Sequence, residues 1–458
     1  MKKFLVILFL GALAITSCKK DLPFTKDHLD FSVDTLLFDT VFTTVGSTTQ
    51  SFKIYNRNNQ KIKIDAIQLM GGESSPFRIN VDGYNTNFIE GIEILPNDSL
   101  FVFVEVTLDV NGQNLPLVVS DSVRFLTNGL NQYVNLDVWG QDAYFHANEL
   151  VEGTWPNDKP HVIYGIAACG YPGLDSGKTL TIPAGTQVYG HKDAKLIIYK
   201  SSLDIQGTYG NEVVFQGDRL ESFYDDISGQ WGGIHMVQAN TSSINYAIIK
   251  NGAVGLQVDT TNAPITLTLT NSIISNHDFF NLLVNAGAIV EANNCLFGDA
   301  GLIGTYLYAG GEYHFTNCSF VNYWAGSRSG PALAISNYWV YEGALYCRSI
   351  NNSTFYNNVV YGTIDKEFEV DTVDCSVDMT FSNNYFKRDE PYNYPAYINT
   401  IWEGNALFYD VSNKDFHLSE TSPLKDWGDY FAPYSPALDI EGVLRDASPD
   451  LGCYEYVP

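Results

Sequence analysis

The chain has 458 residues and a formal net charge of −26 at pH 7, with only 17% charged residues. So acidic a surface repels phosphate backbones, which excludes nucleic acid as an expected partner. With 45% hydrophobic residues and no long 3.6-residue periodicity after the first twenty positions, the sequence predicts two or three all-β domains.

The N-terminus has the pattern of an export signal. Two lysines precede an apolar run, Phe4–Ile15, which is too short to span a bilayer. The run ends in Ile-Thr-Ser-Cys, with the cysteine at position 18. This resembles a bacterial lipoprotein signal, which implies removal of residues 1–17 and lipidation of Cys18. An ordinary secretory signal with a chance cysteine is the alternative.

The residues after Cys18 bear on location. Lys19-Lys20-Asp21 is similar to the lysine–acidic tag that directs lipoproteins to the outer face of the outer membrane in one phylum of Gram-negative bacteria, although Leu22 replaces the second acidic residue. The resemblance implies a surface-exposed protein that is attached to the outer membrane by its lipid. Residues 18–28 are then a tether.

Residues 29–140 alternate polar and apolar positions in short runs, such as Lys61–Asp65 and Ser99–Val106. Gly- and Asn-containing turn signals separate the runs. Seven or eight strands in this length predict a β-sandwich of Ig-like size. The pattern resembles the Ig-like modules of bacterial surface proteins, although the Cys-Trp-Cys signature of true immunoglobulin domains is missing.

Residues 141–160 are predicted to be a junction, and residues 161–458 to form a second domain. The run Leu180–Gly217, with Trp231–Ile234 after it, resembles the first coils of right-handed parallel β-helix proteins. That resemblance implies three short strands in each coil, with like side chains stacked from coil to coil.

A short phrase of the form Asn-Ser/Cys-x-Ile/Phe supports this solenoid. Its copies begin at residues 246, 271, 294, 317, 352 and 383, so the spacings are 25, 23, 23, 35 and 31. A unit this short cannot bury its own apolar side and must stack on its neighbours. The two long spacings exceed 23 by 12 and 8, which predicts insertions in those coils.

Each position of the phrase predicts a ladder along the solenoid. The apolar ladder is Ile249, Ile274, Phe297, Phe320, Phe355 and Phe386, and the first ladder is Tyr246, Asn271, Asn294, Asn317, Asn352 and Asn383. Stacked Asn amides can hydrogen-bond along the axis, and Asn tolerates left-handed turns. Cys295 and Cys318 share a slot, where a disulfide and two reduced cysteines are both sterically possible, with the reduced pair favoured. The segment 439–456 resembles the closing segment of surface β-helix proteins, which implies a cover over the last coil.

Many β-helices resembling this one are polysaccharide lyases or glycosidases. The motifs of those enzymes are missing from the sequence, including Gly-His-Gly and Asn-Thr-Asp. The best acidic candidates are Asp225 and Asp226, with Arg219 nearby, in the run 217–226. They could bind Ca²⁺ or act as carboxylate catalysts, given one more carboxylate from a neighbouring coil. A solvated turn is the alternative.

The insertions are rich in aromatic side chains, which can stack on the apolar faces of sugars. The ligand-binding candidates are Tyr323, Trp324, Arg328, Tyr338, Trp339, Tyr341, Tyr392, Tyr394 and Trp402. These rings could instead fold back and cover the helix.

Two functions follow as hypotheses, and a purely structural or assembly role is a third reading that the sequence does not separate from the first. The first is a non-catalytic, lipid-anchored surface protein that binds glycan or another surface ligand, such as a protein, through the β-helix loops. The second is a polysaccharide lyase or glycoside hydrolase with an atypical site on the side groove of the β-helix. No cofactor is predicted, apart from Ca²⁺ in the second case. An enzyme should bring carboxylates and a base together in one groove, whereas a binder should carry an open aromatic strip.

Overall fold

The computed structural model describes residues 23–109, 117–174, 176–259, 267–285, 287–402 and 404–458, so the predicted lipidation site Cys18 lies outside the described residues. The chain divides into two compact units, Met1–Asp142 and Ala143–Pro458. The described ranges hold no helix that is long and apolar enough to cross a membrane.

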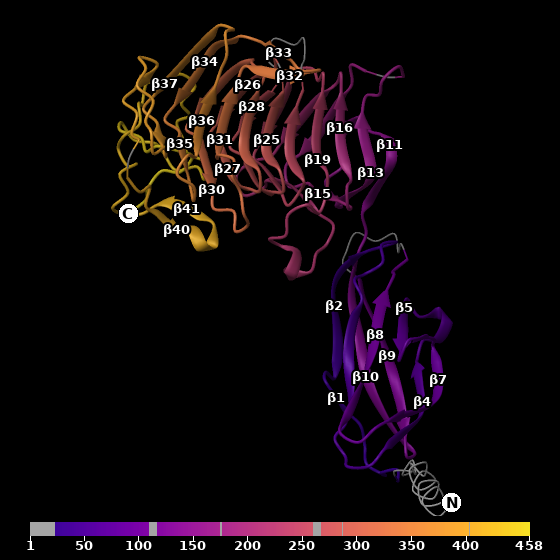
Figure 1. Cartoon of the computed structure of the whole chain (residues 1–458). Coiled ribbons are helices and arrows are strands. Elements are labelled where there is room, and N and C mark those ends of the chain that lie inside the picture. The colour runs from indigo at the N-terminus through magenta and orange to yellow at the C-terminus, as the bar shows by residue number, and fades with distance from the viewer. Residues whose placement is uncertain (1–22, 110–116, 175, 260–266, 286, 403) are drawn as a thin grey trace, which may run out of the picture. The chain divides into compact units, whose positions relative to one another are not determined.

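The first unit is a sandwich of two five-stranded sheets (Figure 1). One sheet has the order β1 (Asp30–Phe31), β3 (Gln50–Asn56), β8 (Asp98–Val106), β5 (Phe77–Val81) and β6 (Tyr84–Asn85). The other has the order β2 (Thr35–Phe42), β10 (Leu130–Gln141), β9 (Leu117–Thr127), β4 (Ile62–Leu69) and β7 (Phe88–Ile94). A short 3-10 turn, η1, spans Gly72–Ser74.

Strand alternation explains this sandwich. Along β8, Val102, Val104 and Val106 are fully buried, while the residues between them face outward. Successive side chains of a strand point to opposite faces, so each sheet contributes one apolar face to the shared core. The predicted β-sandwich is therefore present.

The second unit is a parallel β-solenoid with three strands in each full coil, which confirms the predicted β-helix. Its first face, face A, is the ten-stranded sheet β12 (Gly153–Thr154), β14 (Thr179–Pro183), β17 (Ser202–Gln206), β20 (Ser242–Asn245), β23 (Leu267–Thr270), β26 (Ile289–Asn293), β29 (Glu312–Thr316), β34 (Ile350–Tyr356), β37 (Val377–Ser382) and β39 (Tyr397–Ile398).

The remaining strands form two parallel rows. Face B contains β15 (Gln187–Gly190), β18 (Val213–Gly217), β21 (Ala247–Lys250), β24 (Ile273–His277), β27 (Leu296–Ala300), β30 (Ser319–Asn322), β35 (Val359–Gly362) and β38 (Tyr385–Phe386). Face C contains β16 (Lys195–Tyr199), β19 (Gly233–Val237), β22 (Val254–Val258), β25 (Phe280–Asn285), β28 (Ile303–Tyr308), β31 (Leu333–Ser336) and β36 (Phe368–Asp371).

The solenoid begins earlier in the chain than the sequence pattern indicates. β11 (Tyr144–Leu150) pairs in parallel with the long strand β13 (His161–Cys169), and β12 pairs with β14. Much of the stretch 141–160, which was expected to be a junction, therefore belongs to the first coil. β13 then pairs with both β15 and β16, so it starts faces B and C together.

The register of the coils confirms most of the apolar ladder and corrects one step. Ile249 pairs with Ile274, and the pairing continues through Phe297 to Phe320. The next partner is Val360, which pairs with Phe386. Phe355 lies instead on face A, in a separate stack between Phe315 and Phe381 with ring centroids 5.6 and 4.7 Å away.

Because the copy of the phrase at Asn352 lies on face A, the predicted positions of the insertions also change. Thr316 pairs with Tyr356, so the counterpart of Asn317 is Asn357 rather than Asn352. The spacing from 317 to 357 is 40 and that from 357 to 383 is 26. One long insertion therefore replaces the two predicted ones. The coil keeps its regular face C strand β31, and its additional residues include an antiparallel hairpin, β32 (Tyr338–Tyr341) and β33 (Ala344–Cys347).

The Asn positions do turn the chain. Asn271, Asn294, Asn317, Asn357 and Asn383 all have positive φ, between 49° and 57°. Amide stacking occurs along part of the ladder, where Asn294 Nδ2 donates to Asn271 Oδ1 at 3.1 Å. Farther along, the amides bind the C-terminal strap, which we define as residues 404–458.

The C-terminal strap includes β40 (Phe408–Asp410), the 3-10 turn η3 (Val411–Asn413) and β41 (Asp415–Leu418). Its apolar residues Phe416, Ile440 and Tyr454 pack on the outer side of face B against Leu296 and Val321. The expected cover over the last coil is thus a strap along the side of the solenoid, because the outer face of these coils is itself apolar. Cys295, Cys318 and Cys453 are free and buried.

Candidate functional site

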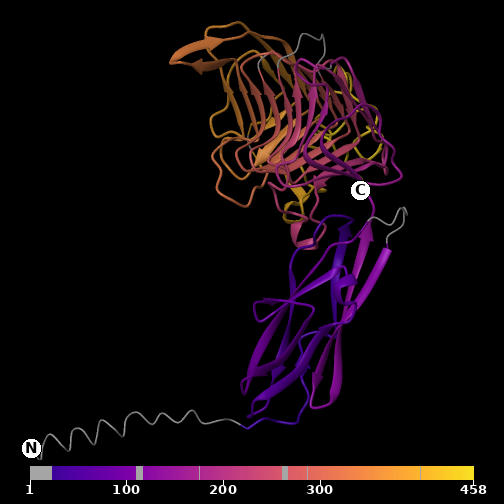
Figure 2. The same cartoon turned by 90° about the vertical axis from the view of Figure 1, so that its right-hand side faces the viewer.

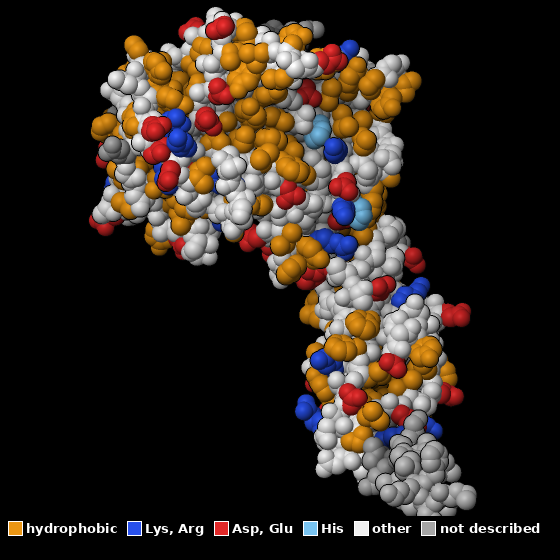
Figure 3. All heavy atoms as spheres, viewed as in Figure 1, with side chains coloured by type: hydrophobic (Ala, Val, Ile, Leu, Met, Phe, Trp, Pro, Cys, Tyr) orange, Lys and Arg blue, Asp and Glu red, His pale blue; other side chains and the backbone are white. Residues whose placement is uncertain are grey.

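An aromatic strip runs along the outer side of face C. We define it as Phe280, Leu283, Tyr306, Tyr308 and Tyr338, all half-buried. Leu282 and Leu307 fill the core, so Leu283, Tyr306 and Tyr308, which alternate with them, point outward, and Phe280 is half-buried at the start of β25. Leu283 pairs in register with Tyr306, and Phe280 stacks near Tyr306 with centroids 6.3 Å apart. Figure 3 shows hydrophobic side chains gathered on this face over β25 and β28.

Carboxylates border the strip on the side of the later coils. Tyr338 Oη donates to Asp371 Oδ2 at 2.6 Å, and this bond raises the pKa of Tyr338 to about 12. Burial, with Asp371 and Glu369 nearby, raises the pKa of Tyr306. Both phenols therefore stay protonated at neutral pH, so each can donate and accept hydrogen bonds. Together the strip offers ring faces with hydroxyl and carboxylate groups beside them.

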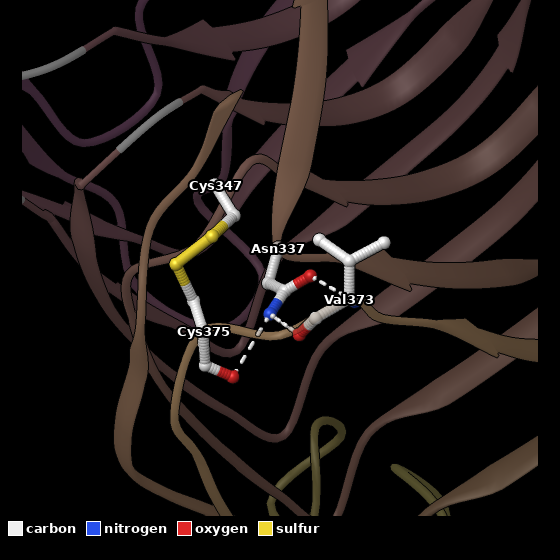
Figure 4. Close-up of a disulfide and its surroundings, with 4 residues drawn as sticks. All are labelled: Asn337, Cys347, Val373 and Cys375. Carbon is white, nitrogen blue, oxygen red and sulfur yellow. Dashed lines mark hydrogen bonds between the residues drawn. A yellow bond between two sulfur atoms is a disulfide. The ribbon is translucent and has the colours of Figure 1, made fainter. Parts of the chain in front are cut away.

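The hairpin β32–β33 follows the strip at the same end of face C. It stands out from the solenoid, as its orange strands in Figure 2 show. Its base is held by the disulfide between Cys347 and Cys375, whose Cα atoms are 5.8 Å apart (Figure 4). Asn337 clamps the same place, because its Nδ2 donates to the carbonyls of Val373 and Cys375 and its Oδ1 accepts from the Val373 N–H.

Besides Tyr338, the hairpin carries two more of the predicted aromatic residues, in different settings. Trp339 stacks on Tyr346 with centroids 5.7 Å apart, and the Arg348 guanidinium lies 5.6 Å from the Trp339 ring centroid. Tyr341 is 60% exposed at the tip, beside exposed Val340 and Leu345. The hairpin therefore extends the strip with further accessible rings.

The other candidates of this insertion are engaged in the fold. Tyr323 packs between Tyr361 and Phe416, and its N–H donates to Asp299 Oδ1 at 2.7 Å. Trp324 is half-buried, with its indole against Gly301. Arg328 is buried in an ion pair with Glu367. We assign these three residues to the framework that joins face B, face C and the strap.

Two of the three candidates after β38 cover the last coil. Tyr392 and Trp402 pack on Phe368, and Trp402 also meets Phe386 at 5.6 Å between centroids. Such a cover removes the open edge of the final coil from solvent. Tyr394 is 66% exposed, and the Arg388 guanidinium lies 4.2 Å from the Tyr392 ring centroid.

The acidic loop, residues 218–230 between β18 and β19, contains the 3-10 turn η2 (Ser222–Tyr224). Asp225 and Asp226 are exposed, while Arg219 is half-buried. Lys414 of the C-terminal strap links this loop to a carboxylate of β27: its Nζ lies 3.5 Å from Asp226 Oδ1 and 3.8 Å from Asp299 Oδ2. Burial raises the pKa of Asp299.

The acidic loop and the strip differ as chemical sites. Asp226 and Asp299 come from different coils and share one lysine, so the loop does meet a second carboxylate, as a hydrolase would need. Among the described residues, no three His, Cys, Asp or Glu side chains come together to hold a metal ion. The strip, by contrast, is an open surface of rings.

Phe280, Tyr306 and Tyr308 were not among the predicted site residues. They belong to regular coils rather than insertions, and each strand contributes only one or two of them. The signal that could have found them is the alternation Tyr306-Leu307-Tyr308, in which a buried leucine separates two outward tyrosines.

Comparison with known proteins finds distant structural similarities. No protein-family model and no curated protein matches the chain. A family 123 glycoside hydrolase from Clostridium perfringens matches with 8% identity and a TM-score of 0.18, over 25% of this chain and 26% of its own length. The ASH/PapD-like domain 7 of human CEP192 matches with 9% identity and a TM-score of 0.17, over 28% of this chain and 90% of that domain. The chain thus spans about a quarter of the hydrolase, and neither likeness carries an argument about function.

Proposed function

We propose that this protein is a lipid-anchored surface protein whose β-solenoid binds glycan chains along the aromatic strip. The observation that carries the proposal is the alignment of outward rings on neighbouring coils, from Phe280 through Tyr306 and Tyr308 to Tyr338. The apolar face of a sugar packs on such rings, and the hydroxyls find phenols and carboxylates beside them.

The geometry of the solenoid also favours a chain-like ligand. Adjacent coils are spaced by one strand separation, about 4.8 Å. An extended chain of pyranose rings advances by a similar distance per ring, so successive sugars can meet equivalent positions on successive coils. The high negative charge of the protein and the carboxylates Glu369 and Asp371 favour neutral glycans over acidic ones.

The binding role is tested with the full chain and a panel of polysaccharides by isothermal titration and glycan arrays. Tyr306→Ala combined with Tyr308→Ala should weaken binding roughly tenfold or more, because two stacking contacts are lost. Tyr209→Ala is the matched control, since Tyr209 is 61% exposed on the solenoid in the loop between β17 and β18. Equal binding by the double variant and the wild type would refute this use of the strip.

The anchor is a separate part of the proposal. It rests on the N-terminal sequence up to Cys18, and the first unit would then be an Ig-like spacer between lipid and solenoid. Expression of Cys18→Ala in a Gram-negative host should move the protein from the membrane fraction to the soluble fraction. Retention of the variant in the outer membrane would argue against lipidation at this residue.

Hydrolysis is a second candidate, favoured by the pair Asp226 and Asp299. The buried Asp299 has a raised pKa, as a general acid needs, while the exposed Asp226 would serve as the base. New reducing ends from a polysaccharide panel, lost in Asp299→Asn and retained in Asp193→Asn, an exposed carboxylate in the turn between β15 and β16, would establish this activity. Unsaturated products that require added Ca²⁺ would instead indicate a lyase.

A further inference from the structure

The first unit carries a pair of exposed aromatic side chains on the sheet that contains β8. Phe101 and Phe103 alternate with core valines on β8, and they are 42% and 43% exposed. Their rings stack with centroids 5.7 Å apart and planes 15° apart. Lys53 Nζ lies 4.6 Å from the centroid of Phe101, so one face of that ring already has a cation beside it. Two adjacent exposed phenylalanines are unusual on an outer sheet face, where polar residues normally alternate with the core.

A hollow lies beside Phe103. Its volume is about 680 Å³, and its lining includes Phe103, Asn80, Asn85, Asn87, Arg78 and Glu105. This volume is within the range of small-molecule sites. The hairpin of β5 and β6 forms one wall, where Asn80 Nδ2 donates to Asn85 Oδ1 at 2.6 Å and Asn80 Oδ1 accepts from the Gly83 N–H. A ring face and several side-chain amides therefore surround one concavity.

The charges beside the hollow narrow the ligand class. Arg78 pairs in register with Glu105, so a cation and an anion lie on adjacent strands. Arg78 Nη1 already donates to the carbonyls of Ser75 and Phe77, and Glu105 accepts from Thr49 Oγ1. The two opposite charges balance each other, so neither an acidic nor a cationic ligand gains a net attraction at this position. A ligand with many hydroxyls and no charge fits both the amides and the ring.

The size of the hollow argues against a protein partner. A stable protein interface covers about 800 Å² on each side, and it needs a broad complementary surface rather than a pocket beside one ring. We propose that the hollow of the first unit binds an uncharged oligosaccharide, with one pyranose stacked on Phe103 and its hydroxyls bound by Asn80, Asn85 and Asn87. The sandwich is then a binding module in its own right and not only a spacer. This extends the proposed glycan-binding role, but it stands on residues that the aromatic strip does not share.

The test uses the full chain and neutral gluco-, manno- and xylo-hexaoses in α- and β-linked forms, with a galacturonic acid hexaose as the acidic comparison. Hydrogen exchange locates binding, and titration calorimetry measures its affinity. At least one neutral hexaose should slow exchange in residues 77–88 and bind roughly tenfold more weakly to Phe103→Ala. Tyr133→Ala is the matched control, because Tyr133 is 49% exposed on β10 of the other sheet and lies outside that segment.

Circular dichroism shows whether Phe103→Ala disturbs the fold. In that case Asn85→Ala provides a second variant, which leaves the aromatic pair in place. No slowing of exchange in residues 77–88 by any neutral hexaose overturns the proposal, as does protection by the galacturonic acid hexaose alone or binding that both variants retain. The double variant Tyr306→Ala with Tyr308→Ala separates the two sites. If it abolishes all hexaose binding, the sandwich site fails while the strip stands; if it leaves the protection of residues 77–88 intact, the sandwich site stands regardless of the strip.

Discussion

Arg328 and Glu367 form an ion pair inside the solenoid, with Nη2 2.5 Å from Oε1 and side chains that are 1% and 0% exposed. Arg328 also donates to the carbonyls of Asn322 and Gly330, and Glu367 accepts from the N–H groups of Ala332 and Ile364. The pair therefore satisfies backbone groups at the start of the long insertion. It fixes the path from β30 into β31, ahead of the hairpin.

Breaking one side of this pair should be costly. Arg328→Met leaves Glu367 buried without its partner, and we expect it to lower the free energy of unfolding of the solenoid by roughly 3–5 kcal/mol. Urea denaturation followed by circular dichroism measures the change. The double variant Arg328→Met with Glu367→Leu should recover much of the loss, because no uncompensated charge remains.

Lys366→Met is the control for that experiment. Lys366 lies next to Glu367 in sequence but forms only exposed contacts, with Asp389 and Glu390 at 4.0 and 3.6 Å. Its substitution should change the unfolding free energy by less than about 1 kcal/mol. Similar losses for Lys366→Met and Arg328→Met would contradict a special role for burial.

The sequence predicted the solenoid because its early coils are uninterrupted. Ile249, Ile274, Phe297 and Phe320 recur at almost constant spacing, and they do stack in that order. The prediction was wrong for the next copy of the phrase. Asn352-Ser353-Thr354-Phe355 has the same residue types, but it lies on face A instead of face B. Local similarity could not reveal this, since strand register depends on pairing with Thr316 and Phe315 in the previous coil.

The candidate site was less predictable than the fold. Sequence reasoning placed the candidate residues in the insertions, and of these Tyr338 belongs to the strip. Phe280 and Tyr306 were not predicted because they lie in regular coils, where one or two aromatic residues in a strand resemble ordinary strand alternation. The pairing of Cys347 with Cys375 also escaped, because 28 residues and several strands separate the two.

The C-terminal strap should depend on Arg445. This buried side chain donates to Asn294 Oδ1 at 2.9 Å and to Glu455 Oε2 at 3.1 Å, and so connects the strap to the Asn ladder. Arg445→Met would leave the buried Glu455 unpaired, which disfavours the docked strap. We expect limited proteolysis to cut within residues 404–458 at least several times faster than in the wild type. Glu420→Gln, an exposed change on the same segment, should cut at the wild-type rate.

The Cys347–Cys375 disulfide should stabilise the hairpin more than the coils. In the chain-entropy description, a loop of 28 residues corresponds to roughly 3–4 kcal/mol. Because β34, β35 and β36 within that loop are also held by pairing with neighbouring coils, most of the loss should appear in residues 338–347. Cys347→Ser with Cys375→Ser should speed hydrogen exchange there and leave β25 and β28 unchanged. Dithiothreitol should cause the same local increase in exchange in the wild type and have no further effect on the double variant. Faster exchange throughout the solenoid would contradict a local role of the disulfide.

Stability should fall with acidification because burial in the solenoid lowers the pKa of several histidines, including His161 and His277. Burial lowers the pKa of His277 and of His161 to about 4. His277 bonds to Asn281 through Nδ1, and its Nε2 has no hydrogen-bond partner among the residues that the structure describes, so the fold accommodates the neutral ring. The unfolded chain binds protons below pH 6.5, whereas the folded chain resists them down to about pH 4. The stabilisation is therefore complete above pH 6.5 and is lost progressively between pH 6.5 and about 4.

The size of this effect is on the order of 3 kcal/mol for each of His161 and His277 across that range, since each pKa unit corresponds to about 1.4 kcal/mol. Urea midpoints measured from pH 7.5 to 4.5 give the slope for the wild type. His277→Gln removes one titrating group, so the variant should lose less stability on acidification than the wild type, even if it is less stable at pH 7.5. His417→Gln is the control, because carboxylates of Asp415 and Glu441 raise the pKa of His417 against the effect of burial. That substitution should steepen the loss at low pH, and equal slopes for all three proteins would show that these histidines do not govern acid stability.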